Sequence, residues 1–82
     1  MFFVYVLYSI NYNKTYVGCT SDLESRFIAH NHHANKGWTK SFMPWKCIYF
    51  EEFETKTDAL KREKELKTGK GRAFIKSLII SK

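Results

Sequence analysis

The fold is decided by FFVYVLY at residues 2–8, a run of apolar and aromatic side chains near the start of the chain. β-Branched and ring-bearing residues dominate the run, which is also short for a helix, so it predicts a strand that is covered on both faces. Residues 11–14 have the composition of a turn, and residues 15–19 are predicted to form the return strand of a hairpin. Gly18 in this second strand has no side chain, which predicts the close approach of another backbone or of a ligand.

A short helix is predicted after the hairpin. Ser21 and Glu24 have the spacing of a capping box, so the helix is expected to begin there and to end at Asn31 or His32. At about 100° per residue, Arg26 and His30 fall together on one edge of the apolar stripe of this helix. They are therefore expected neither deep in the core nor free on the surface.

The segment at residues 31–44 shows no period and is expected to be a long loop of the kind often kept for function. Within it, Trp38 and Phe42 alternate with Lys36 and Lys40. Basic groups placed between rings can hold a phosphate backbone while the rings stack on bases. The alternative is that the two rings anchor the loop to the rest of the domain.

Two further helices are predicted after a third strand at residues 45–53. The first has Thr55 as its cap and is expected to end at Gly69, and the second is expected from about Arg72. The order of elements is ββαβαα. Residues 1–82 are therefore predicted to form a single α+β domain with a three-stranded, mostly antiparallel sheet flanked by helices.

The net charge of +6 comes entirely from the last third of the chain. Residues 1–55 hold five basic and five acidic side chains, whereas residues 56–82 hold nine basic and three acidic ones. This asymmetry predicts a polyanionic partner, most simply nucleic acid, although a solvated lysine-rich helix face is the alternative. The candidate nucleic-acid contacts are Lys14, Lys36, Trp38, Lys40, Arg62, Lys67, Lys70 and Arg72.

The two cysteines, Cys19 and Cys47, lack the spacing of a redox pair or a metal site, so free and buried thiols are expected. The apolar run at residues 2–7 is too short to span a membrane and lacks a basic segment before it. The sequence therefore predicts a cytoplasmic protein with no membrane segment.

Glu63 is placed where a carboxylate is unexpected. On its helical wheel it falls on the apolar face between Ala59 and Leu60, whereas Glu65 points away from that face. A carboxylate in this position costs several kcal/mol unless a charge or a metal meets it. Two interpretations stay open, an ion pair, for example with Arg26, and a ligand for a divalent cation, which prefers carboxylate oxygen.

These residues together resemble the GIY-YIG nuclease family. The resemblance rests, in order and spacing, on FVY at residues 3–5, YVG at residues 16–18, Arg26, His30 and the pattern Ala59-Leu60-x-x-Glu63. It extends to residues 66–72, which resemble the small stand-alone members of the family. Phe3 and Val4 depart from the Gly-Ile of the first motif, and Cys19 stands where several relatives have a lysine that Lys14 is a candidate to replace.

The resemblance implies a metal-dependent endonuclease that hydrolyses phosphodiester bonds in DNA. By position, Glu63 would hold Mg²⁺ or Mn²⁺, Arg26 would contact the phosphate, and His30 would hydrogen-bond a tyrosine. Tyr5 and Tyr16 match paired tyrosines that activate or position the nucleophile. A tyrosine base would need its pKa, about 10 in solution, to be lowered by the metal and by Arg26. The predicted catalytic residues are thus Tyr5, Tyr16, Arg26, His30 and Glu63, with Glu63 as the metal ligand.

A domain of this size has little surface for reading a base sequence, so structure-selective or nonspecific cutting, of the kind used in DNA repair or processing, is the predicted activity. One alternative is a non-catalytic nucleic-acid-binding module that has kept the fold, although binding alone needs neither paired phenols nor a carboxylate on an apolar face. Another is a protein-interaction domain that uses the aromatic loop. His30, His32 and His33 do not supply four ligands at usable spacing, which disfavours a structural zinc site.

Overall fold

The computed structural model describes residues 1–32 and 37–80, except for the side chain of Trp38. Lys36, one of the predicted nucleic-acid contacts, lies outside the described residues. The elements in order are β1 (Phe2–Ser9), β2 (Lys14–Thr20), α1 (Leu23–Asn31), the 3-10 helix η1 (Trp38–Phe42), β3 (Lys46–Phe53), α2 (Lys56–Leu66) and α3 (Gly69–Ile80). The predicted α+β class and the order ββαβαα are confirmed. The helix η1 is an addition, because its segment was predicted to be a loop.

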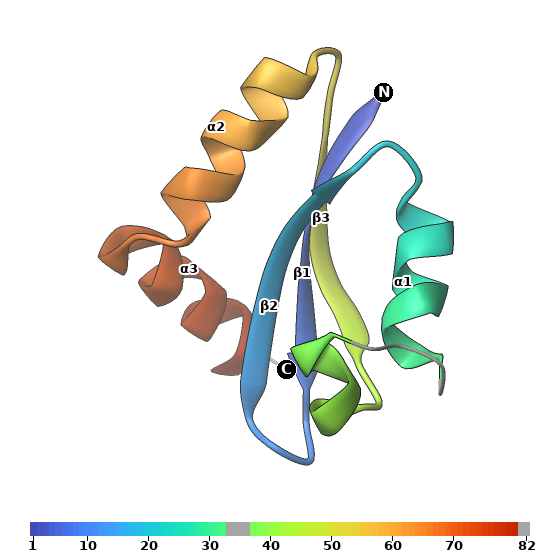
Figure 1. Ribbon diagram of the computed structural model, residues 1–82. Helices are drawn as coiled ribbons and strands as arrows, with labels where there is room; N and C mark the ends of the chain where they lie inside the picture. The colour runs from blue at the N-terminus through green and yellow to red at the C-terminus, as the bar shows by residue number, and fades with distance from the viewer. Residues whose placement is uncertain (33–36, 81–82) are drawn as a thin grey trace.

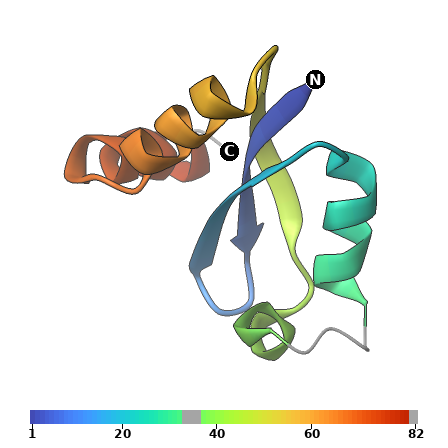
Figure 2. The same cartoon turned by 45° about the horizontal axis from the view of Figure 1, so that its top comes forward.

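The sheet has the strand order β2-β1-β3, and both outer strands run antiparallel to β1. β1 is central because it is apolar on both faces, as its sequence predicts. Figure 1 shows α2 and α3 on one face of the sheet and α1 on the other, and Figure 2 shows the same three layers from another angle. β2 is therefore an edge strand that lies between helices on both faces.

Each face of the sheet has its own core. On one face, the buried side chains of Val4, Val6, Val17, Ala59, Leu66 and Ile75 pack together. On the other face, Tyr5, Leu7 and Trp45 pack with partly buried residues that include Leu23 and Phe27 of α1. Successive side chains of a strand point to opposite faces, so β1 supplies Val4 and Val6 to one core and Tyr5 to the other.

The cap of α1 differs from the prediction. Asp22, not Ser21, is the N-cap, and its carboxylate accepts hydrogen bonds from the N–H and the hydroxyl of Ser25 at 3.1 and 2.9 Å. These bonds lower the pKa of Asp22. An ionised carboxylate is also favoured by the helix dipole at this end, which explains why Asp22 caps the helix in preference to the serine beside it. The predicted end at Asn31 is correct.

The boundary between α2 and α3 also differs from the prediction. Thr55 caps α2 as expected, through a hydrogen bond from the Asp58 N–H, but α2 ends at Leu66 and Gly69 begins α3. The glycine required by packing is Gly71, where an added Cβ would strike the backbone of the last turn of α2. Neither glycine ends α2, because the C-cap of that helix is Lys67 and both glycines belong to the first turn of α3.

Both cysteines are free and partly buried. Within the part of the chain that the structure describes, no helix combines the length and the hydropathy needed to cross a membrane.

Candidate active site

The hydroxyl of Tyr5 is the point at which the candidate residues meet. Tyr5 is 1% exposed and pairs directly with Gly18 of β2. A Cβ built on Gly18 would lie 2.5 Å from the Tyr5 hydroxyl oxygen and 2.9 Å from a ring carbon of Tyr16. The sequence predicted a backbone or a ligand close to Gly18, whereas the structure places the two candidate tyrosines there.

His30 connects α1 to this hydroxyl. Its Nε2 lies 3.0 Å from the Tyr5 hydroxyl and its Nδ1 lies 3.1 Å from the hydroxyl of Thr39, and its ring centroid is 4.7 Å from that of Tyr16. Burial, helped by the charge of Arg26, lowers the pKa of His30. The imidazole is therefore neutral near pH 7, so one ring nitrogen is available as a hydrogen-bond acceptor.

Thr39 and Trp45 hold His30 in place, and sequence reasoning singled out neither for this role. The carbonyl oxygen of Thr39 accepts a hydrogen bond from Trp45 Nε1 at 2.8 Å, and Trp45 in turn shares backbone hydrogen bonds with the side-chain amide of Asn31. These contacts tie the end of α1 to η1 and to the start of β3. Thr39 lies in a segment without periodicity, so no sequence pattern marks it as a partner of His30.

The Tyr5 hydroxyl keeps its proton at neutral pH. Its pKa is raised above the ordinary value, mainly by burial and then by the neighbouring Tyr16 and the Glu63 carboxylate. The charge of Arg26 lowers this pKa, but burial outweighs it. The lowered pKa that a tyrosinate base would need is therefore not found at Tyr5.

The charges of Arg26 and Glu63 both affect the pKa of Tyr5, although the two residues lie on helices on opposite faces of the sheet (Figure 1). Arg26 is exposed on α1, Glu63 is 20% exposed on α2, and both charges act on Tyr5. Two helices on opposite faces can do this because β2 is an edge strand and Gly18 leaves it without a side chain at this point. The structure thus places Tyr5, Tyr16 and His30 side by side, with Arg26 and Glu63 near enough for their charges to affect Tyr5.

Glu63 forms its ion pair with Lys67 rather than with Arg26. Lys67 Nζ lies 2.8 Å from Glu63 Oε2, and the lysine is 55% exposed. An ion pair this exposed, one helical turn apart, contributes only about 0.3–0.5 kcal/mol. The proposed partnership of Glu63 with Arg26 is wrong, because Glu63 sits at the margin of the core, where a neighbouring lysine on its own helix reaches it.

Glu63 is also the residue that could hold a metal. The described residues contain no cluster of three or more His, Cys, Asp or Glu side chains that could ligate one. Mg²⁺ commonly binds through one or two carboxylates and completes its shell with water and substrate phosphate. A single, partly exposed carboxylate that already attracts the Lys67 ammonium fits a site of this kind.

The predicted nucleic-acid contacts are divided by the structure. Lys67, Lys70 and Arg72 gather at the turn between α2 and α3, whereas Lys14 and Lys40 lie near the hairpin, Lys14 with its Nζ 5.6 Å from the centre of the Phe42 ring. Phe42 is partly buried in the core on the α1 face. This favours an anchoring role for Phe42 over stacking on bases.

Arg62 is held by two carboxylates. Its Nε lies 2.8 Å from Glu51 Oε2 and its Nη1 lies 3.1 Å from Glu65 Oε2. Its charge is therefore already balanced by β3 and by its own helix. For this reason Arg62 is not assigned to the nucleic-acid surface.

The comparisons with known proteins identify the family of the chain. The family model described as the GIY-YIG catalytic domain matches residues 1–76, which contain every candidate residue. A UPF0213 protein of Staphylococcus saprophyticus is 45% identical over 65% of this chain and 65% of its own length. A UPF0213 protein of Staphylococcus epidermidis is 39% identical over 80% of this chain and 79% of its own length. No solved structure gives a significant match.

Proposed function

Because the chain belongs to the GIY-YIG family, we propose that it is a metal-dependent endonuclease that hydrolyses phosphodiester bonds in DNA. Domains of this family are endonucleases, so the class of activity is nuclease and the substrate class is nucleic acid. The observation that carries the finer proposal is the convergence of Arg26, His30 and Glu63, from two faces of the sheet, on the hydroxyl of Tyr5.

Arg26 is assigned to the scissile phosphate. It is exposed on α1 beside the Tyr5 hydroxyl, so a phosphate at the edge of β2 can reach its guanidinium. A guanidinium matches two phosphate oxygens and stabilises the negative charge that grows on them in the transition state. Glu63 would hold the Mg²⁺ or Mn²⁺ whose charge offsets that of the scissile phosphate and of the leaving oxygen.

Tyr16 is assigned to the attacking water. Of the two tyrosines it is the half-buried one, and its ring centroid lies 6.1 Å from that of Tyr5. The water oxygen forms the new bond to phosphorus while the bond from phosphorus to the leaving oxygen breaks, and the leaving oxygen departs with the electron pair. The proton of the water passes to the Tyr16 oxygen. The Tyr16 proton moves to Tyr5, and the Tyr5 proton moves to His30 Nε2.

His30 is assigned as the final proton acceptor of this chain. Its lowered pKa keeps Nε2 free to accept near neutral pH, in the tautomer in which Nδ1–H donates to the Thr39 hydroxyl. In this scheme Tyr5 never has to exist as a stable tyrosinate, which agrees with its raised pKa. The two tyrosines move the proton and the histidine keeps it.

A panel of labelled substrates tests the proposal. Single-stranded, duplex, flap and junction DNA, with RNA counterparts, are incubated with and without Mg²⁺ or Mn²⁺. We expect cleavage of DNA that requires the metal, and structure-selective or nonspecific cutting consistent with a cytoplasmic role in DNA repair or processing. A folded sample that cuts none of them would favour the non-catalytic binding module instead.

The assignment of the tyrosines has its own test. Tyr16→Phe and Tyr5→Phe each remove one hydroxyl and interrupt the proton chain at different points. We expect both variants to bind DNA as the wild type does and to lose most of their turnover. Full activity in either variant would refute the proton chain without refuting the nuclease assignment.

A further inference from the structure

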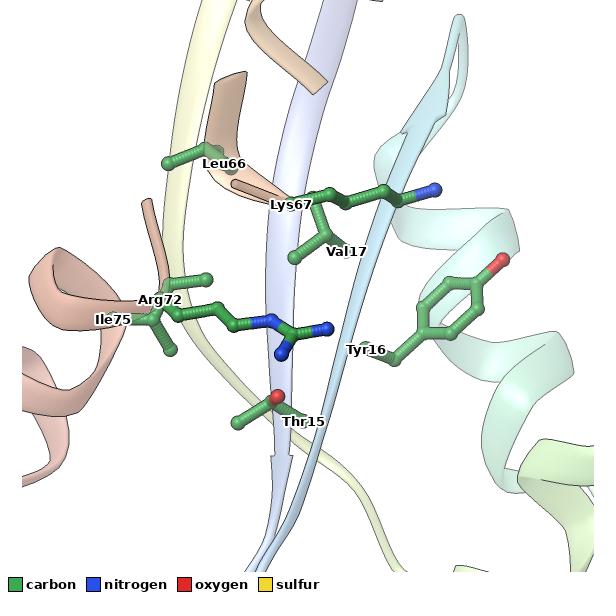
Figure 3. A pocket seen from close by; sticks show the side chains of 7 residues that line it. All are labelled: Thr15, Tyr16, Val17, Leu66, Lys67, Arg72 and Ile75. Carbon is green, nitrogen blue, oxygen red and sulfur yellow. The ribbon is translucent and has the colours of Figure 1, made fainter. Parts of the chain in front are cut away.

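A cavity of about 260 Å³ lies beside the candidate active site, on the face of β2 that is turned toward α3. Figure 3 shows Arg72 extending from α3 toward β2, Lys67 extending across β2, and the Tyr16 ring pointing away toward α1. The residues that line the cavity are Thr15, Tyr16, Val17, Leu66, Lys67, Arg72 and Ile75. The cavity and the active site therefore share Tyr16 and lie on the two sides of the same edge strand.

The lining has the chemistry of an anion site. Its charged groups are the Arg72 guanidinium and the Lys67 ammonium, and the latter is paired with Glu63. The Thr15 hydroxyl also lines the cavity, and among the described residues no carboxylate does. Within the described residues, the Arg72 side chain has neither an ion pair nor a hydrogen bond. An apolar floor of Val17, Leu66 and Ile75 strengthens the attraction of these cations for an anion, because it keeps water away from one side.

The size of the cavity limits its ligand. Pockets for drug-sized molecules and cofactors have volumes of about 300–1,000 Å³, and this one is smaller. A single phosphodiester group fits both the volume and the charge. The Lys67 side chain also contacts Glu63 at 2.8 Å, so an anion in the cavity lies next to the catalytic carboxylate.

A larger groove, of about 660 Å³, does not suit a polyanion. It lies between α1 and β3, where Phe3, Leu23, Phe27 and Phe50 form its apolar part and Asp22, Glu24 and Glu52 bring carboxylates. These carboxylates repel a phosphate backbone. A substrate strand that passes the active site is therefore favoured toward α3 and not toward β3.

We propose that the cavity between β2 and α3 binds a backbone phosphate of the substrate strand next to the scissile one, held by Arg72, Lys67 and the Thr15 hydroxyl. This inference rests on the proposed nuclease function. Arg72 and Lys67 bind a phosphate that is not cut, so their contribution is to position the strand along β2. The site makes the enzyme sensitive to one particular phosphate besides the scissile one.

The test is a scan with neutral linkages. Single-stranded DNA oligonucleotides, each with one methylphosphonate linkage at a different position, are bound to the wild-type protein in EDTA, so that no cutting interferes. We expect one position in addition to the scissile one at which the neutral linkage weakens binding by roughly five- to tenfold. Arg72→Met should bind every oligonucleotide more weakly than the wild type does, and a neutral linkage at this position should cause no further loss of affinity.

Salt dependence gives a second measure of the same contact. Loss of one phosphate contact lowers the slope of log affinity against log salt by about 0.7 for single-stranded DNA. We expect this decrease for Arg72→Met. The matched control is Lys64→Met, which removes a charge from an exposed position on α2 outside the cavity and should leave the methylphosphonate profile unchanged. Thr15→Val is a second variant, expected to weaken sensitivity at the same position.

The outcomes separate this inference from the proposed function. If Arg72→Met keeps the full wild-type profile while the wild type cuts DNA in Mg²⁺, the cavity inference is wrong and the nuclease assignment stands. A third outcome is that no methylphosphonate position weakens binding, while inorganic phosphate displaces DNA more than chloride does at equal ionic strength. If that displacement also requires Arg72, the cavity is a site for free phosphate and not for the strand. If the wild type cuts no substrate, the proposed function itself has failed.

Discussion

Gly18→Ala tests whether the site depends on the position of the Tyr5 hydroxyl. The new methyl group would lie 2.5 Å from the Tyr5 hydroxyl oxygen, and ordinary contact begins at 3.4 Å, so the hydroxyl must retreat by about 0.9 Å. Tyr5 is almost fully buried and bound to His30 at 3.0 Å, so it cannot move without breaking that hydrogen bond. Overpacking of this kind costs about 1–3 kcal/mol of stability. A displacement of about 1 Å at a reacting group costs about 100-fold in turnover.

The assay is a denaturant melt beside a cleavage assay on the same preparation. The matched control is Gly69→Ala, where nothing lies within 4 Å of the added Cβ. Because alanine is the better helix former, this control should be as stable as the wild type or more stable by up to about 1 kcal/mol. Its cleavage rate should not change.

A double variant identifies the cause of the loss. Tyr5→Phe removes the oxygen that the Gly18→Ala methyl group strikes, so the double variant should recover part of the lost stability and none of the lost turnover. Such non-additivity is expected of two side chains in direct contact. Wild-type turnover and stability in Gly18→Ala would refute the reasoning that this hydroxyl must stay where the structure places it.

Three further predictions follow from the contacts of the site. Glu63→Gln should change the free energy of unfolding by less than about 1 kcal/mol and keep DNA binding while abolishing cleavage, because the pair with Lys67 is exposed; a loss of about 3–5 kcal/mol in the melt would instead reveal a buried ion pair. Thr39→Val should leave His30 Nδ1 without its partner, which costs about 1–3 kcal/mol and lowers turnover without changing DNA affinity; unchanged turnover would remove Thr39 from the support of His30. Folding lowers the pKa of His30, so below about pH 6.5 the unfolded chain binds a proton that the folded protein resists. The stability should therefore fall as the pH drops below that value, and it should fall less in His30→Gln. Denaturant melts between pH 8 and pH 5 measure the difference.

The sequence predicted the sheet and the position of several candidate side chains well because each depends on a local pattern. The apolar run of β1 predicted a strand covered on both faces, and the structure places it in the centre of the sheet. The helical wheel placed Arg26 and His30 on one edge of α1, and the structure has Arg26 exposed and His30 buried against Tyr5. The wheel was less accurate for Glu63, which it set on the apolar face of α2 between Ala59 and Leu60, because Leu60 is exposed in the structure and Glu63 is partly exposed.

The features that the sequence did not predict depend on contacts between distant segments. The bond from Thr39 to His30 needs η1 to fold back beside the end of α1, and no period in residues 31–44 indicates that turn. The cavity depends on Arg72 of α3 facing Thr15 of β2 (Figure 3), and α3 begins at Gly69 and not at about Arg72 as predicted. The ion-pair interpretation named Arg26, on another helix, as a partner of Glu63, whereas the structure pairs Glu63 with Lys67 one turn further along its own helix.

The location of the site on an edge strand explains how so small a domain can place opposite charges around one phosphate. A guanidinium on α1 and a carboxylate on α2 stand on opposite faces of the sheet, so in the interior the sheet itself would separate them. At β2 no further strand intervenes, and Gly18 removes the one side chain that would block the Tyr5 hydroxyl. A substrate strand that meets both charges must therefore run along the edge of β2. On the α3 side of that edge, the next groups it meets are Lys67, Arg72 and Thr15, which is why the cavity there belongs to the path of the strand.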